Sequence, residues 1–190
     1  MTVADDDLAI DYARHDGVEE IVEWIRYVFE ELSLSFDNWD DEFARGPGMY
    51  VAIVSGRTVA EFADPMGTNR WPVDECPVIE PGVDGFYEAA ETVAWTRDGA
   101  VVVSVDGVIL SQMVRFRDPD PRSEVGSTDY DAWMGSRHMS ALDTSGRPSV
   151  VSTLTLSEED GRVTVFRERT YETMYSEDLG GRWRRKDSTD

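Results

Sequence analysis

Three short segments of the sequence place polar and ionisable groups where a strand or a helix should begin or end. The first is Asp98-Gly99-Ala100, which directly precedes an apolar run. A carboxylate at the entrance of a strand can bind a metal ion or a hydroxyl group, and the small residues after it let a ligand approach the backbone. An Asp-Gly pair is also a common turn, so this segment alone defines no site.

The second segment combines the expected start of a helix with an arginine and a histidine. Gly135 and Ser136 precede a helical pattern. Ser136 is expected to cap the helix, and the free amides of the first turn would attract an anion such as a triphosphate. Arg137 would add a charge-assisted contact, and His138 would reach phosphate or metal. The alternative interpretation is a surface ion pair for Arg137 and a core position for His138.

The third segment, Ser157-Glu158-Glu159, places paired carboxylates at an expected hairpin turn that ends with Gly161. Carboxylates in this arrangement can complete a metal site. In a chain this acidic they can equally be solvated turn residues. None of the three segments is therefore decisive when it is taken alone.

Taken together, the three segments resemble in order and content the diadenylate cyclase family, whose hallmarks are an Asp-Gly-Ala motif and a Gly-Thr-Arg-His-Arg motif. The likeness covers about residues 17–170, and outside the motifs it is one of pattern. It implies a stand-alone, haloarchaeal-type enzyme that condenses two ATP molecules into cyclic di-AMP and two pyrophosphates. It also implies Mn²⁺ or Mg²⁺ as cofactor and a homo-oligomer in which two protomers face each other.

The resemblance also implies roles for individual residues. The catalytic residues would be Asp98, Arg137 and His138. The ATP-binding residues would be Gly99, Ala100, Gly135, Ser136, Arg137 and His138, with Arg115 and Phe116 bordering the base. The metal ligands would be Asp98, Glu159 and His138. Asp98 would in addition activate the ribose 3′-hydroxyl.

Two positions depart from the family pattern. Met139 stands where the family has its second arginine, and Arg115-Phe116 stands near a usual Leu-Pro pair. Ser136 replaces threonine but keeps the hydroxyl. A non-catalytic sensor of ATP or cyclic di-AMP with the same fold is therefore an alternative. An interaction protein whose motifs are coincidental is a third.

The overall charge favours a salt-adapted, halophilic protein. Asp and Glu number 39 against 18 Lys and Arg, which gives a formal charge of −21, and Lys186 is the sole lysine. Molar salt shortens the Debye length to about 3 Å and relieves the resulting self-repulsion. The charge argues against sequence-independent binding of nucleic acid. The basic run at residues 182–186 is expected to be a solvated or docking tail.

Cysteine, histidine and hydropathy limit the other possibilities. Cys76 is the sole cysteine and His15 and His138 are the two histidines, so a metal would be held mainly by carboxylates. No segment reads as a signal peptide or a membrane span, which predicts a cytoplasmic protein without a membrane partner.

The elements expected to position these residues form an α/β (α+β) fold, a mixed central β-sheet with helices packed on both faces, in one domain over residues 1–190. Apolar periodicity predicts helices over residues 17–32, 86–95 and 136–142, with caps at Asp16 and Asp84. A continuously apolar run predicts a buried strand at residues 49–54. Residues 100–116 and 149–167 are each expected to form a hairpin, the second closing the sheet. Residues 63–85 are expected to form a long connection with room for one short strand or turn of helix.

Overall fold

The computed structural model describes residues 12, 15–41, 43–56, 58–118 and 129–180, so the predicted tail at 182–186 lies outside the described residues. Three helices are present within this part of the chain: α1 (Asp16–Leu34), α2 (Gly85–Thr96) and α3 (Ser136–Ser145). The strands are β1 (Met49–Val54), β2 (Ala63–Arg70), β3 (Val101–Ser104), β4 (Gln112–Phe116), β5 (Val150–Leu156), β6 (Val163–Arg167) and β7 (Thr170–Met174). A short 3₁₀ helix, η2 (Ser176–Asp178), follows β7.

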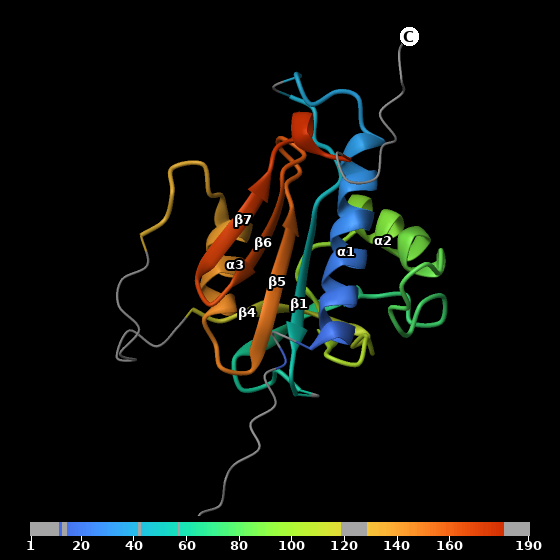
Figure 1. Cartoon of the computed structure of the whole chain (residues 1–190), viewed down its shortest axis with the longest axis vertical. Coiled ribbons are helices and arrows are strands. Elements are labelled where there is room, and N and C mark those ends of the chain that lie inside the picture. Colours follow the sequence, from blue (N-terminus) through green and yellow to red (C-terminus); the bar gives the residue numbers. More distant parts are fainter. Residues whose placement is uncertain (1–11, 13–14, 42, 57, 119–128, 181–190) are drawn as a thin grey trace, which may run out of the picture.

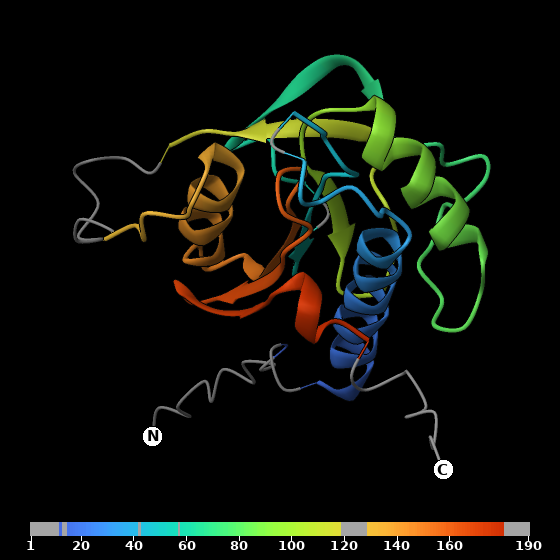
Figure 2. The same ribbon diagram turned by 90° about the horizontal axis from the view of Figure 1, so that it is seen from above.

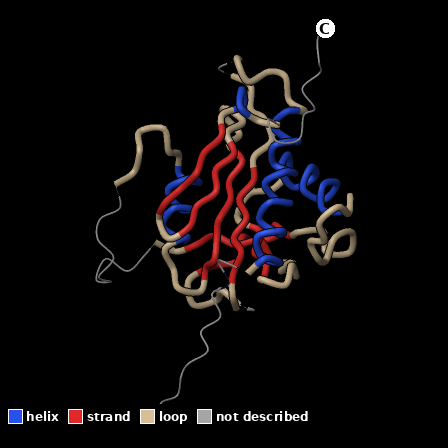
Figure 3. The backbone as a smooth tube through the Cα atoms, viewed as in Figure 1, coloured by secondary structure: helices blue, strands red, loops and turns tan. Residues whose placement is uncertain are grey.

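The strands form one mixed sheet and a smaller ladder (Figure 1). The five-stranded sheet has the order β3-β1-β5-β6-β7, and the second sheet pairs β2 with β4. β1 and β3 run parallel, whereas the β1–β5, β5–β6 and β6–β7 pairs are antiparallel. Figure 3 shows the strands of the main sheet side by side, with helical segments on either side of them. The predicted mixed α+β fold is confirmed.

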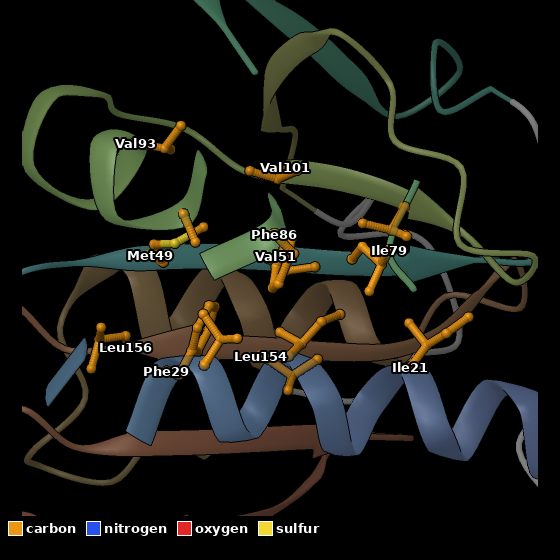
Figure 4. Packing of buried hydrophobic residues seen from close by; sticks show 14 of the residues in the cluster. Ile21, Phe29, Met49, Val51, Ile79, Phe86, Val93, Val101, Leu154 and Leu156 are labelled. Carbon is orange, nitrogen blue, oxygen red and sulfur yellow. The ribbon is translucent and has the colours of Figure 1, made fainter. Parts of the chain in front are cut away.

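β1 is buried on both faces because each face meets a different core. Met49, Val51 and Ile53 belong to the cluster formed with α1 and α2. Figure 4 shows Met49 and Val51 in this cluster between the two helices. The alternate residues of β1, from Tyr50 to Val54, pack into a second cluster with α3 and β4. Seen from above in Figure 2, α3 lies on one side of the sheet, and α1 and α2 lie on the other.

The apolar stripe of α1 forms as its periodicity predicts. The residues that repeat at helical spacing are all buried, namely Ile21, Val22, Ile25, Val28, Phe29 and Leu32. The predicted cap is wrong by one residue, because His15 is the N-cap and Asp16 begins the helix. Asp84 is the N-cap of α2 as expected, although its side chain makes no capping hydrogen bond. No helix of the described residues has both the length and the apolar composition that a bilayer crossing requires.

The hairpin predicted over residues 100–116 is only partly correct. The chain does reverse after β3, and the backbones of Ala100 and Val114 exchange hydrogen bonds of 2.7 and 3.0 Å. The regular ladder of β4 is nevertheless with β2. β2 lies within residues 63–85, the segment that was expected to be mainly a connection. β2 contains Pro65 and Gly67 and is mostly exposed, so it lacks the apolar alternation by which a strand is recognised.

The hairpin of β5 and β6 is confirmed, but it does not close the sheet, because β7 adds a further strand at the edge of β6. Glu168 and Arg169 form the connecting turn with φ values of 47° and 62°. Such turns usually contain Gly, Asn or Asp. Their replacement by Glu and Arg explains why the sequence pattern did not indicate this strand.

Candidate functional site

The three polar segments meet at one end of β1 because of the directions of its neighbours. β3 runs parallel to β1, with Val101 opposite Val51, so Asp98-Gly99-Ala100 enters beside the start of β1. β5 runs antiparallel, with Leu156 opposite Met49, so Ser157-Glu158-Glu159 leaves at the same end. The hydroxyl of Tyr50 donates to the carbonyl oxygen of Ser140 at 3.2 Å, which ties α3 to this end of the strand.

A cavity of about 710 Å³ opens between these segments. Its lining includes all the residues for which the resemblance implied ATP, metal or catalytic contacts: Asp98, Gly99, Ala100, Arg115, Phe116, Gly135, Ser136, Arg137, His138 and Glu159. The lining also includes residues that the sequence did not indicate, among them Arg45, Tyr50, Met66 and Arg97. Residues widely separated in the chain therefore share one concave surface.

Asp98 lies exposed at this cavity, and the backbone after it has a geometry that requires glycine. Its Oδ1 accepts a hydrogen bond from the amide of Gly99 at 2.7 Å. Gly99 has φ +94°, and a Cβ there would come within 2.8 Å of Met66 Cγ and 3.0 Å of the Val114 carbonyl oxygen. Because the backbone holds the carboxylate in this way, Asp98 is placed to contact a polar group of a ligand.

The first turn of α3 faces the cavity. Its N-cap is Gly135 and not Ser136, which corrects the expected cap, and no side chain caps this end. The amides of the first turn of a helix have no partner within the helix. Gly135, Ser136 and Arg137 all line the cavity, so this helix end and an arginine lie together where an anion could bind.

Arg137 and Arg45 share one carboxylate at the rim of the cavity. Arg137 Nη2 lies 3.6 Å from Oε2 of Glu158, and Arg45 Nη1 lies 3.2 Å from Oε1. The Arg137 side chain is 22% exposed, so it is largely sheltered rather than a freely solvated surface group. Sequence reasoning singled out Glu159, but the neighbouring Glu158 makes the contacts with the arginines.

His138 is a buried residue that also borders the cavity. Its residue exposure is 6%, and its ring meets that of Trp133 edge to face at a centroid distance of 5.0 Å. Burial lowers the pKa of His138 from 6.5 to about 4, an effect that the nearby Asp160 opposes. His138 is therefore neutral at pH 7, and its Nε2 has no hydrogen-bond partner among the described residues.

One wall of the cavity is apolar. Tyr50, Val114 and Phe116 belong both to the second core cluster and to the lining. The rings of Tyr50 and Phe116 lie 5.6 Å apart in a tilted arrangement, and burial raises the pKa of the Tyr50 hydroxyl. A cavity that combines an apolar surface with a helix end and an arginine suits a ligand that has a flat apolar part and an anionic part.

The lining carries no net formal charge, unlike the chain as a whole. It holds four arginines and four acids: Arg45, Arg97, Arg115, Arg137, Asp98, Asp118, Glu158 and Glu159. The whole chain has a formal charge of −21. Arginines are therefore concentrated at the cavity, which is the arrangement that an anionic ligand requires.

The predicted metal ligands do not form a ready-made site. No group of three His, Cys, Asp or Glu side chains in the described part of the chain is placed to hold a metal ion. Asp98, Glu159 and His138 line the same cavity but do not form such a group. These three residues alone do not fit a bound divalent ion.

Comparison with known proteins gives a shared fold but no family. No family model and no curated protein matches the chain. A hypothetical membrane spanning protein from Bacillus cereus is similar with a TM-score of 0.55 and 18% identity, over 80% of this chain and 62% of that one. DacA from Staphylococcus aureus has a TM-score of 0.48 and 15% identity, with coverage of 84% and 89%. The Bacillus cereus structure shows that this arrangement of helices and strands occurs elsewhere, and the present chain spans less than two thirds of it.

Proposed function

We propose that this protein is a diadenylate cyclase that condenses two ATP molecules into cyclic di-AMP and two pyrophosphates. The observation that carries the proposal is the meeting of three segments in one cavity. Asp98-Gly99-Ala100, Gly135-Ser136-Arg137-His138 and Ser157-Glu158-Glu159 resemble family motifs, and all of them line it. Coincidental motifs on separate loops would have no reason to converge in this way.

The two walls of the cavity suggest an orientation for ATP. The adenine would lie on the apolar wall of Tyr50, Val114 and Phe116. The phosphates would lie at the first turn of α3, where backbone amides and Arg137 provide positive charge. Asp98, which also lines the cavity, would then face the ribose.

In the proposed reaction the 3′-hydroxyl of one nucleotide attacks the α-phosphorus of the other. Asp98 accepts the hydroxyl proton as the new P–O bond forms, and pyrophosphate leaves with the electrons of the broken P–O bond. Arg137 offsets negative charge on the phosphates. His138 is neutral, so it would act as a hydrogen-bonding group rather than as a cation. Most of the catalytic effect would come from positioning.

Ring closure needs two sites that face each other. The chain supplies one set of Asp98, Arg137 and Glu159, whereas the product contains two new phosphodiester bonds. Two protomers, each with one ATP, would therefore complete the ring. A divalent ion, Mn²⁺ or Mg²⁺, would arrive with the ATP phosphates, whose charge it neutralises, since the described residues offer no three-ligand site of their own.

The test is incubation of the purified protein with ATP and Mn²⁺ or Mg²⁺ in high salt, followed by mass analysis of the nucleotides. Asp98→Asn is the matched control, because it removes the charge and keeps the shape. We expect cyclic di-AMP from the wild type and none from Asp98→Asn, with ATP binding and the fold retained. ATP binding by the wild type without product would indicate a sensor instead. No ATP binding would contradict both functions.

A further inference from the structure

Arg45 was not indicated by any sequence motif, yet its guanidinium shares a carboxylate with Arg137. Arg45 precedes β1, and Arg137 lies in the first turn of α3. Each contacts a different oxygen of Glu158, at 3.2 Å for Arg45 and 3.6 Å for Arg137. All three residues line the cavity. Two guanidinium groups therefore converge on one anionic group at the rim of the candidate site.

The backbone holds Arg45 at this rim independently of its side chain. The amide of Gly46 donates to the Glu158 carbonyl oxygen at 2.9 Å, which joins the segment before β1 to the turn after β5. Gly46 is buried, and a Cβ at this residue would overlap the ring of Trp39. The Arg45 side chain itself is 80% exposed. An ion pair so exposed contributes little to stability, so the fold does not require this arginine where it stands.

We propose that Arg45 is a second anion-binding residue of this site and that it contacts the phosphate chain of a nucleoside triphosphate together with Arg137. The proposal rests on the proposed function, whose ligand it specifies further. Glu158 pairs with both guanidinium groups in the ligand-free protein, and phosphate oxygens replace its carboxylate when the nucleotide binds. Guanidinium groups bind phosphate and carboxylate with the same fork geometry, so the exchange needs little rearrangement.

The position of Met139 explains why a second arginine for the triphosphate would have to come from a segment other than α3. Met139 packs, partly buried, against the second core cluster and is not among the residues that line the cavity. A triphosphate carries several negative charges, whereas the end of a helix supplies about half a positive charge. Arg45 reaches the cavity from another segment and provides a second full charge there.

The test compares Arg45→Gln with the wild type in calorimetric titrations of ATP, adenosine and inorganic tripolyphosphate at one fixed salt concentration. We expect ATP and tripolyphosphate to bind about tenfold more weakly and adenosine to bind as before, because one charge-assisted contact to phosphate is lost. Arg167→Gln is the matched control. Arg167 pairs with Glu19 at 2.8 Å beside α1, on the other face of the sheet, so the same loss of charge should leave all three affinities unchanged.

Three outcomes would overturn the proposal, and one would separate it from the proposed cyclase activity. ATP and tripolyphosphate affinities equal to those of the wild type in Arg45→Gln, with a clear loss in Arg137→Gln, would show that Arg45 takes no part. Equal losses in Arg45→Gln and Arg167→Gln would show a general charge effect. If Arg45→Gln binds ATP and tripolyphosphate more weakly and the wild type forms no cyclic di-AMP, the role of Arg45 is supported and the proposed cyclase activity is rejected. Absence of ATP and tripolyphosphate binding by the wild type would reject both.

Glu158→Gln tests independently whether phosphate oxygens replace the Glu158 carboxylate at the two guanidinium groups. The amide keeps the size of the side chain but removes the charge that competes with phosphate. We expect tripolyphosphate to bind several-fold more tightly than to the wild type. Weaker binding would contradict the exchange, since it would mean that the carboxylate has to stay in place to position the arginines.

Discussion

The guanidinium of Arg137 lies directly beside Gly48, where a Cβ would come within 2.5 Å of Arg137 Nη1 and 2.9 Å of Glu158 Cβ. The Gly48 amide donates to the Ala94 carbonyl oxygen at 3.1 Å, so the backbone is not free to retreat. Gly48→Ala should therefore displace the Arg137 guanidinium and also press on Glu158, whose Cβ is fixed to the backbone of the turn after β5. We expect ATP affinity to fall about tenfold, the value of one lost charge-assisted contact, together with a lower melting temperature.

Gly56→Ala is the control for this substitution. Gly56 follows the other end of β1, and the nearest atom to an added Cβ is the Thr58 carbonyl oxygen at 3.8 Å. ATP titration of both variants decides the matter. Equal affinities for Gly48→Ala and the wild type would show that the position of Arg137 does not matter for binding.

Met139→Arg tests whether an arginine at the position after His138 would contact phosphate. Because Met139 packs against the second core cluster, we expect a loss of about 1 to 3 kcal/mol of stability and no gain in ATP affinity. Urea unfolding and ATP titration measure the two quantities. Tighter ATP binding with unchanged stability would show that an arginine at residue 139 reaches the phosphates after all.

His138 should make stability depend on pH. The pKa of His138 is about 4 in the folded protein because of burial, against 6.5 ordinarily. The unfolded chain therefore takes up a proton first, and stability falls as the pH drops from about 6.5 to about 4. Between pH 7 and 4.5 this loss should be about 2 to 3 kcal/mol.

His138→Phe provides the comparison, because its ring can stay among Trp133 and Phe166. The carboxylates titrate in both proteins, so the difference between their losses isolates the imidazole. Free energies of unfolding in urea at the two pH values should show the smaller loss in His138→Phe. Equal losses would mean that His138 takes up its proton as readily in the folded protein as in the unfolded chain.

Assembly of facing protomers should make activity depend on concentration. Repulsion between chains of formal charge −21 weakens association unless salt screens it. We expect the specific rate of cyclic di-AMP formation to fall on dilution and to recover as salt rises, with static light scattering recording the dimer. Dilution-independent activity from a species that scatters as a monomer would contradict the facing-protomer mechanism.

Most of the fold was predictable because its central elements carry strong apolar patterns. β1 was predicted with its observed bounds, since six consecutive buried residues leave little choice of structure. α2 and α3 were also placed correctly to within a few residues. A short strand was allowed for within residues 63–85, but the place of β2 and its pairing were not predicted, because β2 is largely exposed. β7 was missed because it follows a turn without glycine. Both depend on pairing with a neighbour rather than on their own pattern.

The site was predictable in its motifs but not in its partners. Asp98, Arg137 and Glu159 stood out by residue type and spacing. Arg45 and Tyr50 did not. Arg45 is brought to the cavity by the backbone hydrogen bond between Gly46 and Glu158, and Tyr50 by the register of β1 with β5. Likewise, the geometry of the turn at Ser157 decides that Glu158 and not Glu159 contacts the arginines. The spacing of residues in the sequence does not indicate these contacts.

The contrast between a neutral cavity lining and a strongly acidic chain affects how fast an anionic ligand can reach the cavity. At low ionic strength the field of the whole chain extends far into the solvent and repels such a ligand, although the lining itself is neutral. Added salt suppresses this distant repulsion before it weakens contacts at 3 to 4 Å. The association rate of ATP should therefore increase with salt, opposite to the behaviour of a basic protein that draws in its anionic ligand.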